Sequence, residues 1–318
     1  MSKPFASSAD TERKRETFEI LAEGVYALTA EGDPNVGAVE SEDGLICIEA
    51  RATPVAATRW LDQLQKKSGK KPAALVLTHY HAVRTLGAAA FNVGTIIAHE
   101  NTKRLIDERG KEDWKSEYGR MPRLFEDPDS IPGLTHPTET FDDVRVLELG
   151  GGRTLELHYC GRGHTAGDII AWLPEEKILF AGDLVEAEAA LYTGDAFHTD
   201  WSTDTLNKVK SFGAEQLIGG RGAVAQGREA VAAAIEQTRS FLIGMREEVG
   251  AVHERKGTLK EAFERTHARL APRYGAWPIF EHCLPFNVQR LWDEFDGIDW
   301  PRIWTAERDR EVWAQLQG

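Results

Sequence analysis

The feature that most constrains this chain is a set of metal-ligating side chains placed directly after short apolar runs. His79 and His81 follow the apolar run 73–77 and are separated by one residue. His164 lies in a glycine-rich connection, and Asp183 follows another apolar run. Apolar runs of this length, bounded by turn residues, are typical of buried strands. A loop at the end of a strand can aim both histidines of the first pair at one point, which favours a metal site there.

The apolar runs alternate with turn signals, and this alternation predicts an α/β chain. The first four runs have the spacing of an antiparallel meander, and the later ones have the spacing of hairpins. Helices are expected at 53–70 and 86–91, where the spacing or the small residues favour them. The expected strands are 18–21, 25–30, 36–39, 45–48, 73–77, 95–98, 145–149, 154–160, 169–173 and 178–181.

Two regions are expected to differ from this alternation. Residues 100–140 are polar and rich in proline and glycine after a first short helix, which predicts an irregular insertion and a candidate lid. Apolar residues between 231 and 249 recur at steps of four and three, which predicts a long helix. Thr258 is expected to cap a second helix, and Asn287 and Thr305 are expected to cap two more.

The last part of the chain is rich in tryptophan. Five of the nine tryptophans lie between Trp277 and Trp313. One interpretation is a core that docks these helices onto the sandwich or onto a second subunit, and the other is an aromatic wall that faces a substrate. A homodimer in which residues 277–283 close over the site is a further expectation.

Length, charge and cysteine content limit the class of protein. The 318 residues allow a tail at 1–17, one large domain at 18–227 and a helical extension at 228–318. A net charge of −13 argues against nucleic-acid partners and favours a small-molecule substrate. Three widely spaced cysteines argue against a disulfide framework. The polar start lacks the apolar core of a signal peptide, and no apolar run reaches the roughly 18 residues of a membrane span. We therefore expect a cytoplasmic protein without membrane association.

The ligand-bearing motifs, in this order, resemble the metallo-β-lactamase superfamily. The family pattern is HxHxDH after a strand, then GHTxG, then FxGD, then a late histidine flanked by glycines. The resemblance covers roughly residues 18 to 225 and implies an αββα sandwich, to which this chain adds a C-terminal helical extension. The matching segments are His79-Tyr80-His81-Ala82-Val83-Arg84, Gly163-His164-Thr165-Ala166-Gly167, Phe180-Ala181-Gly182-Asp183 and Gly219-Gly220-Arg221-Gly222.

The resemblance also implies the metal ligands. His79, His81 and His164 correspond to the family residues that hold one ion, and Asp183 corresponds to the aspartate that commonly bridges two ions. We therefore expect these four residues to bind one divalent ion, with zinc preferred over iron or manganese. A site without any ion, kept as a hydrogen-bonded remnant, is the alternative.

The residues of the second ion are replaced in this chain. Val83, Arg84 and Arg221 occupy those positions, and none can ligate a metal, because valine has no donor atom and guanidinium has no free lone pair. The two arginines are expected either to form ion pairs with Asp183 and Glu49 or to hold an anionic group of a substrate.

Four further residues are expected near the site. Asp168 would orient the His164 loop or an imidazole, and Glu49 would pair with an arginine. His198 and His282 are candidates for an extra ligand, an acid or base, or a substrate contact.

The favoured function is a single-metal hydrolase. It would act on a small ester, thioester, lactone or related anionic substrate through a metal-activated water. Asp183 would ligate the metal or accept a proton from the water, and Arg84 and Arg221 would take part in catalysis. The alternative is a catalytically silent protein of the same fold that holds an anion with these two arginines. A third interpretation, redox chemistry, would be indicated by iron in place of zinc.

Overall fold

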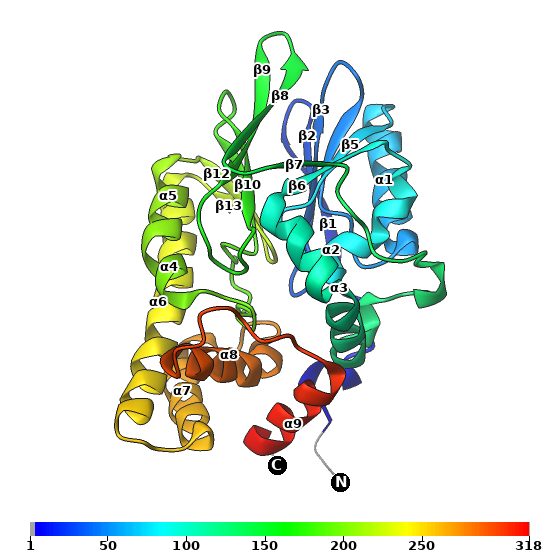
Figure 1. Ribbon diagram of the computed structural model, residues 1–318. Coiled ribbons are helices and arrows are strands. Elements are labelled where there is room, and N and C mark those ends of the chain that lie inside the picture. Colours follow the sequence, from blue (N-terminus) through cyan, green and yellow to red (C-terminus); the bar gives the residue numbers. More distant parts are fainter. Residues whose placement is uncertain (1–3, 318) are drawn as a thin grey trace.

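In the computed structural model, which describes residues 4–317, the strands form two sheets that pack face to face (Figure 1). The first sheet has seven strands in chain order, antiparallel from β1 to β4 and parallel from β4 to β7. The second has six, in the order β13-β12-β11-β10-β9-β8, with β11 and β12 parallel. The strands are β1 (Glu16–Ala22), β2 (Val25–Ala30), β3 (Val36–Glu40), β4 (Leu45–Ile48), β5 (Pro72–Val76), β6 (Thr95–His99), β7 (Glu139–Phe141), β8 (Val144–Gly150), β9 (Arg153–Tyr159), β10 (Ile169–Leu173), β11 (Ile178–Gly182), β12 (Gln216–Gly219) and β13 (Ala225–Gln226).

Helices cover the outer faces of both sheets, which completes the expected αββα order (Figure 1). The first sheet packs against α1, and the second packs against α5 and α6. The expected helix at 86–91 is a 3-10 helix (Leu86–Phe91) that follows the short α2. The α-helices are α1 (Pro54–Ser68), α2 (Ala82–Thr85), α3 (Glu100–Arg120), α4 (His198–Asp200), α5 (Leu206–Ser211), α6 (Arg228–Glu254), α7 (Leu259–Tyr274), α8 (Phe280–Phe295) and α9 (Ala306–Gln317).

Alternation along the strands divides the apolar side chains between two layers of core. In β2, Val25 and Ala27 lie between the two sheets, whereas Tyr26 and Leu28 pack toward α1. This two-residue period follows from the pleat of a strand, which points successive side chains to opposite faces. Both faces of β2 and β4 are buried, so these inner strands are packed from two sides.

The prediction of an irregular insertion over residues 100–140 is wrong for its first half. Residues 100–120 form α3, which is rich in the helix formers Glu, Lys and Arg. Its buried face includes Arg109, Asp113 and Arg120, so the helix has no apolar stripe that a pattern search could detect. Two 3-10 turns and β7 follow it.

The C-terminal helices begin close to the expected positions. The Thr258 hydroxyl caps α7 through the amide of Glu261, and the Thr305 hydroxyl accepts from the amide of Arg308 at the start of α9. The prediction that Asn287 caps a helix is wrong, because Asn287 lies inside α8. Its amide side chain instead binds the backbone of the loop that contains Thr193.

The tryptophan-rich region contributes to the core. Trp304 and Trp313 are each 3 % exposed, and both rings pack against Phe286 of α8. This geometry matches the docking interpretation rather than an open aromatic wall. The three cysteines are unpaired and buried. In the part of the chain that the structure describes, no helix has the length and apolar character needed to cross a membrane.

Candidate metal centre

Hydrogen bonds hold both ends of the loop that follows β5 and contains His79 and His81. The backbone amide of Thr78 donates to Glu49 Oε1 at 2.7 Å, and His81 is the N-cap of the one-turn helix α2. The first two amides of α2 donate to carboxylates of α3, namely Asp113 and Glu117. A one-turn helix has few internal hydrogen bonds, so these external acceptors hold its start, and His81 with it.

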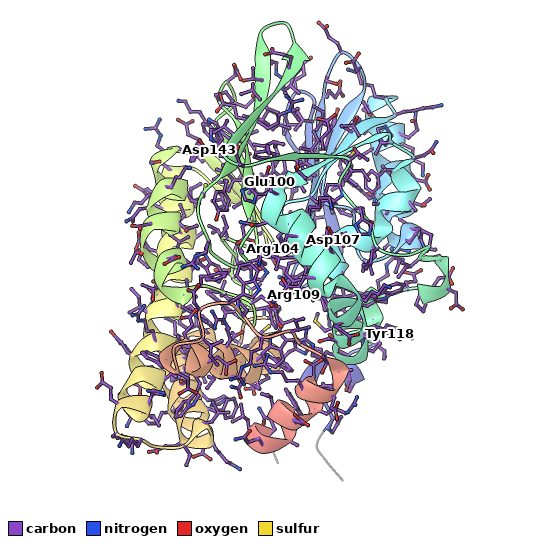
Figure 2. All side chains as sticks on the ribbon, viewed as in Figure 1. Glu100, Arg104, Asp107, Arg109, Tyr118 and Asp143 are labelled. Carbon is purple, nitrogen blue, oxygen red and sulfur yellow. The ribbon has the colours of Figure 1, made fainter. Side chains whose placement is uncertain are left out.

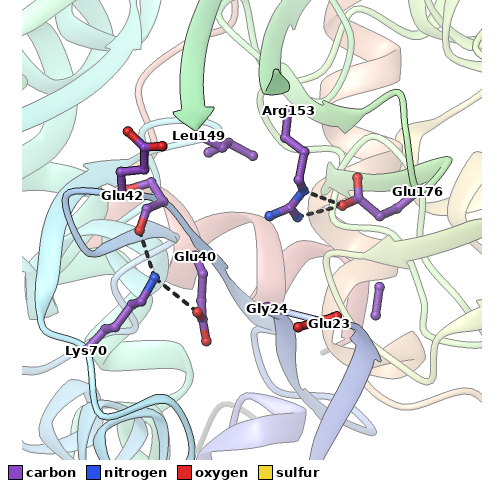
Figure 3. A pocket seen from close by; sticks show the side chains of 10 residues that line it. Glu23, Gly24, Glu40, Glu42, Lys70, Leu149, Arg153 and Glu176 are labelled. Carbon is purple, nitrogen blue, oxygen red and sulfur yellow. Dashed lines mark hydrogen bonds and ion pairs between the residues drawn. The ribbon is translucent and has the colours of Figure 1, made fainter. Parts of the chain in front are cut away.

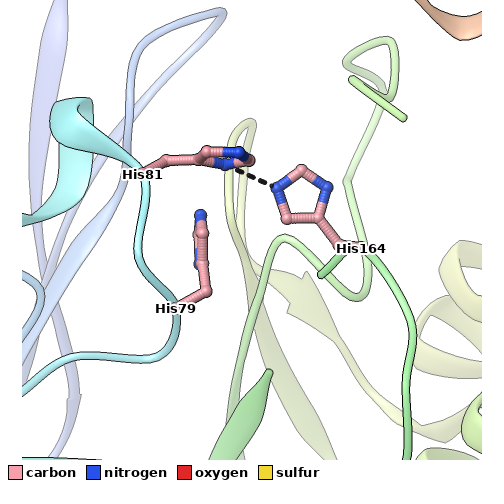
Figure 4. Close-up of side chains that lie close together, drawn as sticks. All are labelled: His79, His81 and His164. Atoms are coloured by element: carbon pink, nitrogen blue, oxygen red, sulfur yellow. Dashed lines mark hydrogen bonds between the residues drawn. The ribbon is translucent and has the colours of Figure 1, made fainter. Parts of the chain in front are cut away.

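Three histidines converge on one point at the edge of the two sheets (Figure 4). The rings of His79, His81 and His164 have centroids 4.8 to 5.0 Å apart. One nitrogen from each ring lies within 4.8 Å of the others. All three side chains are buried, at 2 % exposure or less. They form a metal-binding triad that joins the loop after β5 to the loop before β10.

Each ring is oriented by a partner on its outer nitrogen. Thr78 Oγ1 lies 3.0 Å from His79 Nδ1, and the Tyr192 carbonyl oxygen lies 2.8 Å from His164 Nδ1. On the third ring, His81 Nε2 lies 3.3 Å from Asp195 Oδ2. Metal-binding histidines commonly have a hydroxyl, carbonyl or carboxylate on the ring nitrogen that does not bind the metal, because it fixes the ring and its tautomer.

One of the three inward nitrogens, His81 Nδ1, carries a proton that a metal ion would have to displace. A carbonyl only accepts, so His164 Nδ1 donates to Tyr192, and burial lowers the pKa of His164 to about 3. Its Nε2 is therefore bare and accepts from His81 Nδ1, 3.0 Å away. His81 also donates through Nε2 to the Asp195 carboxylate, so both of its nitrogens are protonated.

The charges around His81 agree with this assignment. Burial alone would lower its pKa, but Asp113, the hydrogen bond to Asp195 and Glu117 raise it to about 9. In the opposite direction, the pKa of His79 is held well below its ordinary value, mainly by burial. His79 and His164 are thus neutral and ready to bind a metal, whereas His81 must first lose a proton.

The donor set fits a divalent ion such as zinc. Two nitrogens bonded to one tetrahedral ion at about 2.0 to 2.1 Å lie roughly 3.4 Å apart, close to the 3.0 Å between His81 Nδ1 and His164 Nε2. His79 Nε2 is buried and has no hydrogen-bond partner among the described residues. A buried donor or acceptor without a partner is costly, and an ion at this point would satisfy it.

Asp183 lies beside the triad but is held by arginines. Its Oδ2 is 3.7 Å from His79 Nε2 and 3.6 Å from His164 Nε2. Arg84 binds its Oδ1, and Arg221 Nη1 lies 2.9 Å from its Oδ2. Burial would raise the pKa of Asp183, yet the two guanidinium groups hold it well below its usual range. The carboxylate is therefore ionised and close enough to serve as a fourth ligand.

The backbone near these arginines leaves room only for glycine. A Cβ at Gly220 would lie 2.1 Å from Asp183 Oδ1 and 2.8 Å from Arg84 Nη2. Arg84 Nη2 also donates to the Gly220 carbonyl at 2.8 Å. The glycine in the late motif thus lets the chain approach the Asp183–Arg84 pair closely.

The ion pairs differ in part from the expectation. Arg221 pairs with Glu186 at 2.8 Å in addition to Asp183, and Glu186 was not singled out from the sequence. Among the described residues Glu49 forms no ion pair, because its Oε1 accepts from Thr78 and its Oε2 has no partner. Burial raises the pKa of Glu49 to about 7 and that of Glu186 to about 8, while Arg84 and Arg221 act to lower these values.

The remaining expected residues lie at three different places. Asp168 accepts from the amide and hydroxyl of Thr165, so it fixes the turn next to His164. His198 binds the Thr193 hydroxyl and faces Glu294, and it does not join the triad. His282 is buried on α8 and is not part of the triad.

Sequence reasoning missed the residues that surround His81. Asp195, in the loop after β11, forms an ion pair with Arg109 of α3 at 3.1 Å. The Arg109 guanidinium lies under the Trp300 ring, and Figure 2 shows it on α3 near Arg104. Asp195 belongs to none of the motifs, so its position beside His81 could not be predicted from the sequence.

The triad is covered, and a separate hollow lies elsewhere in the molecule. The Tyr192 ring contacts the rings of His81 and His164, and it is itself only 9 % exposed. A hollow of about 480 Å³ lies among the turns around Lys70, Arg153 and Glu176 (Figure 3). Lys70 precedes β5 whereas His79 follows it, so this hollow is at the opposite end of the strand. Its ion pairs, Arg153 with Glu176 and Lys70 with Glu40, are formed within the chain.

A two-sheet sandwich with three histidines at one edge defines an α/β metalloprotein. The sequence model of the family described as the metallo-beta-lactamase superfamily matches residues 30–221, and the chain belongs to that superfamily. Membership suggests a metal-dependent hydrolase.

Individual relatives are distant. The chain is 27 % identical over 194 residues to metallo-beta-lactamase type 2 of Bacillus cereus, a match that covers 60 % of this chain and 67 % of that protein. It is 27 % identical over 186 residues to the protein of the same name in Bacillus sp. (strain 170), covering 57 % and 64 %. A solved metallo-beta-lactamase from Pontibacter korlensis has a TM-score of 0.57 and 20 % identity, covering 72 % of this chain and 99 % of that one. These likenesses support the fold and leave the substrate open.

Proposed function

We propose that this chain is a hydrolase that uses one divalent metal ion, held by His79, His81 and His164. The proposal rests on the orientation of the three rings. Each ring turns one nitrogen toward a common point and has a hydrogen-bonding partner on its other nitrogen, as metal-binding histidines commonly do. Zinc is the preferred ion for three histidine ligands with one open position.

When bound, such an ion would supply Lewis acidity that polarises a carbonyl oxygen and activates water. Asp183 suits the role of ligand better than that of base, because a base works best with a pKa near the working pH and the arginines hold its pKa far lower. Arg84 and Arg221 would keep this carboxylate ionised and supply the positive charge that a second ion brings elsewhere in the family.

The closed surroundings of the triad limit the size of the substrate. The three histidines are buried beneath Tyr192, so only a small substrate would reach them, and only after a local opening. We take this substrate to be a small ester, thioester or lactone with an anionic group.

The test combines metal analysis with turnover. Protein purified without added metal should contain about one ion per chain, and His79→Ala and His164→Ala should lose most of it. His267→Ala is the matched control, because His267 is partly exposed and pairs with Glu281 far from the site. An ester, thioester and lactone panel should be hydrolysed by the parent and the control, and by neither site variant. Full turnover without metal would refute the proposal.

The burial of the triad also favours a second candidate, a catalytically silent protein that binds an anion. In that case Arg84 and Arg221, or another cationic group, would hold the ligand and the metal would be idle. The same panel separates the two candidates, because a silent protein would keep its metal yet turn over no substrate.

A further inference from the structure

The loop between β11 and α4 supplies the outer partners of two histidines of the triad. Tyr192 presents its carbonyl oxygen to His164 Nδ1 at 2.8 Å, and Asp195 presents its carboxylate to His81 Nε2 at 3.3 Å. Both residues are buried. Buried backbone polar groups outside helices and sheets need partners from elsewhere, so the position of this loop depends on the side chains that bind its backbone.

An asparagine of the C-terminal extension binds the loop on both sides of Tyr192. Asn287 of α8 accepts from the amide of Thr193 at 2.6 Å and donates to the carbonyl of Leu191 at 2.8 Å. An amide N–H only donates and a carbonyl only accepts, so these two partners fix which way the Asn287 side chain is turned. The asparagine is fully buried. It therefore holds the backbone immediately before and after Tyr192.

Two further side chains of the extension bind the loop on both sides of Asp195. Trp304 Nε1 donates to the carbonyl of Gly194, and Arg290 Nε donates to the carbonyl of Ala196, each at 2.8 Å. Both donors are buried, at 3 % and 1 % exposure. Each loop residue that contacts a histidine thus lies between two residues that the extension binds.

These contacts come from outside the part of the chain that the superfamily model matches. The match ends at residue 221, whereas α8 begins at residue 280. Arg290 also donates to the carbonyls of Ile298 and Asp299, so it ties the end of α8 as well as the loop. Both printed bonds of the Asn287 side chain go to the loop, which makes Asn287 the contact most specific to it.

We propose that the C-terminal extension positions the metal centre, and that Asn287 is the main positioning residue. By holding the backbone around Tyr192, it places the carbonyl that orients His164. That the oriented ring then binds an ion rests on the proposed function. The orientation of the ring itself does not depend on it.

The most direct variant is Asn287→Leu, which keeps a side chain of similar size but removes both hydrogen bonds. The amide of Thr193 and the carbonyl of Leu191 would then be buried without their partner, which is costly, so the loop should shift. Because Tyr192 lies between these two groups, its carbonyl should shift with them. Loss of the outer partner of a metal-binding histidine typically lowers metal affinity about 10- to 100-fold.

The first test is the zinc affinity of the full chain, measured by competition with a chelator. Asn287→Leu should bind zinc about tenfold or more weakly than the parent. Asp293→Asn is the matched control, because Asp293 is buried on the same helix and binds Arg308 instead of the loop. The control should bind zinc as the parent does. Equal zinc affinity in Asn287→Leu and the parent would overturn the proposal.

The second test needs no metal and separates positioning from a general loss of stability. In the metal-free parent, the proton on His164 Nδ1 is held by the Tyr192 carbonyl and should give a slowly exchanging imidazole N–H signal in NMR spectra. The signal is assigned by its loss in His164→Ala. It should shift or disappear in Asn287→Leu and persist in Asp293→Asn. An unchanged signal in Asn287→Leu would overturn the proposal.

A milder variant keeps the proposal testable if Asn287→Leu does not fold. Trp304→Phe retains an aromatic ring but loses the N–H group that binds Gly194, so zinc binding should weaken several-fold. Trp292→Phe is its control, since the Trp292 ring lies on α8 against His253. Equal zinc affinity in these two variants would count against the extension as the positioning element.

The two proposals fail separately. Absence of zinc binding in the parent would refute the metal site, and the His164 signal, measured without metal, would still decide the positioning. Zinc binding and hydrolysis by the parent, with unchanged zinc affinity in Asn287→Leu, would refute the positioning alone.

Discussion

Metal binding by this chain should release a proton that comes from His81. In the metal-free protein the imidazole of His81 donates through both nitrogens, to His164 and to Asp195. An ion at the triad must take the nitrogen that faces His164, so that proton has to leave. With a pKa of about 9 for His81, nearly every molecule carries the proton at pH 7.

The size of the pH effect on zinc affinity follows from the difference between this pKa and the working pH. Zinc affinity should fall about 50-fold, or about 2.3 kcal/mol, between pH 9 and pH 7, and the slope should approach tenfold for each pH unit well below pH 9. The sign is fixed by competition, because protons and the ion share one nitrogen and a lower pH favours the proton. His79 and His164 add little over this range, since burial keeps them neutral.

Two measurements would check this linkage. Calorimetric titration of zinc at pH 7, in buffers with different enthalpies of ionisation, should report release of about one proton per ion, falling to about half at pH 9. Competition with a chelator of known affinity should give the tenfold slope. A zinc affinity that changes less than about twofold between pH 7 and pH 9 would refute the assignment of the proton to His81.

Three other substitutions test parts of the same site. Asp195→Asn should lower the pKa of His81, flatten the pH dependence of zinc binding and weaken that binding about tenfold or more; an unchanged slope would contradict the role of Asp195. Arg221→Met should lower the free energy of unfolding by roughly 3 kcal/mol, because Asp183 and Glu186 lose a buried partner, and a urea-denaturation loss below about 1 kcal/mol would argue that Arg84 alone is sufficient. Gly220→Ala should cost roughly 2 kcal/mol or more, because its Cβ would meet Asp183 Oδ1 at 2.1 Å; a melting temperature equal to that of the parent would show that the loop can move aside.

The strand ends that carry the triad could be predicted because their signals are local. The apolar run 73–77 and the motif around His164 each combine a buried strand with an adjacent loop, and the observed strands follow them closely. Strands β7, β12 and β13 were not predicted, and β7 and β13, with three and two residues, are too short to show a pattern.

The surroundings of the triad could not be predicted, for a different physical reason. The inward face of α3 is ionic, and a helix with charges at steps of three and four looks the same in sequence as one that faces solvent. Asp195 is 114 residues from His81, and Arg120 meets Asp309 only after α9 has packed. Such pairs form only when distant segments pack together, and this packing cannot be inferred from a single sequence.

Hydrogen exchange at the contact between α2 and α3 can report on the state of the metal centre. The amides of Ala82 and Val83 donate to the carboxylates of Asp113 and Glu117, whereas the start of a helix usually leaves such amides to water. Their hydrogen-exchange rates therefore measure whether two helices remain docked, and not merely whether one helix is folded. Because His81 immediately precedes these amides, isotope labelling read out by mass spectrometry could follow occupancy of the centre without a chromophore or a substrate.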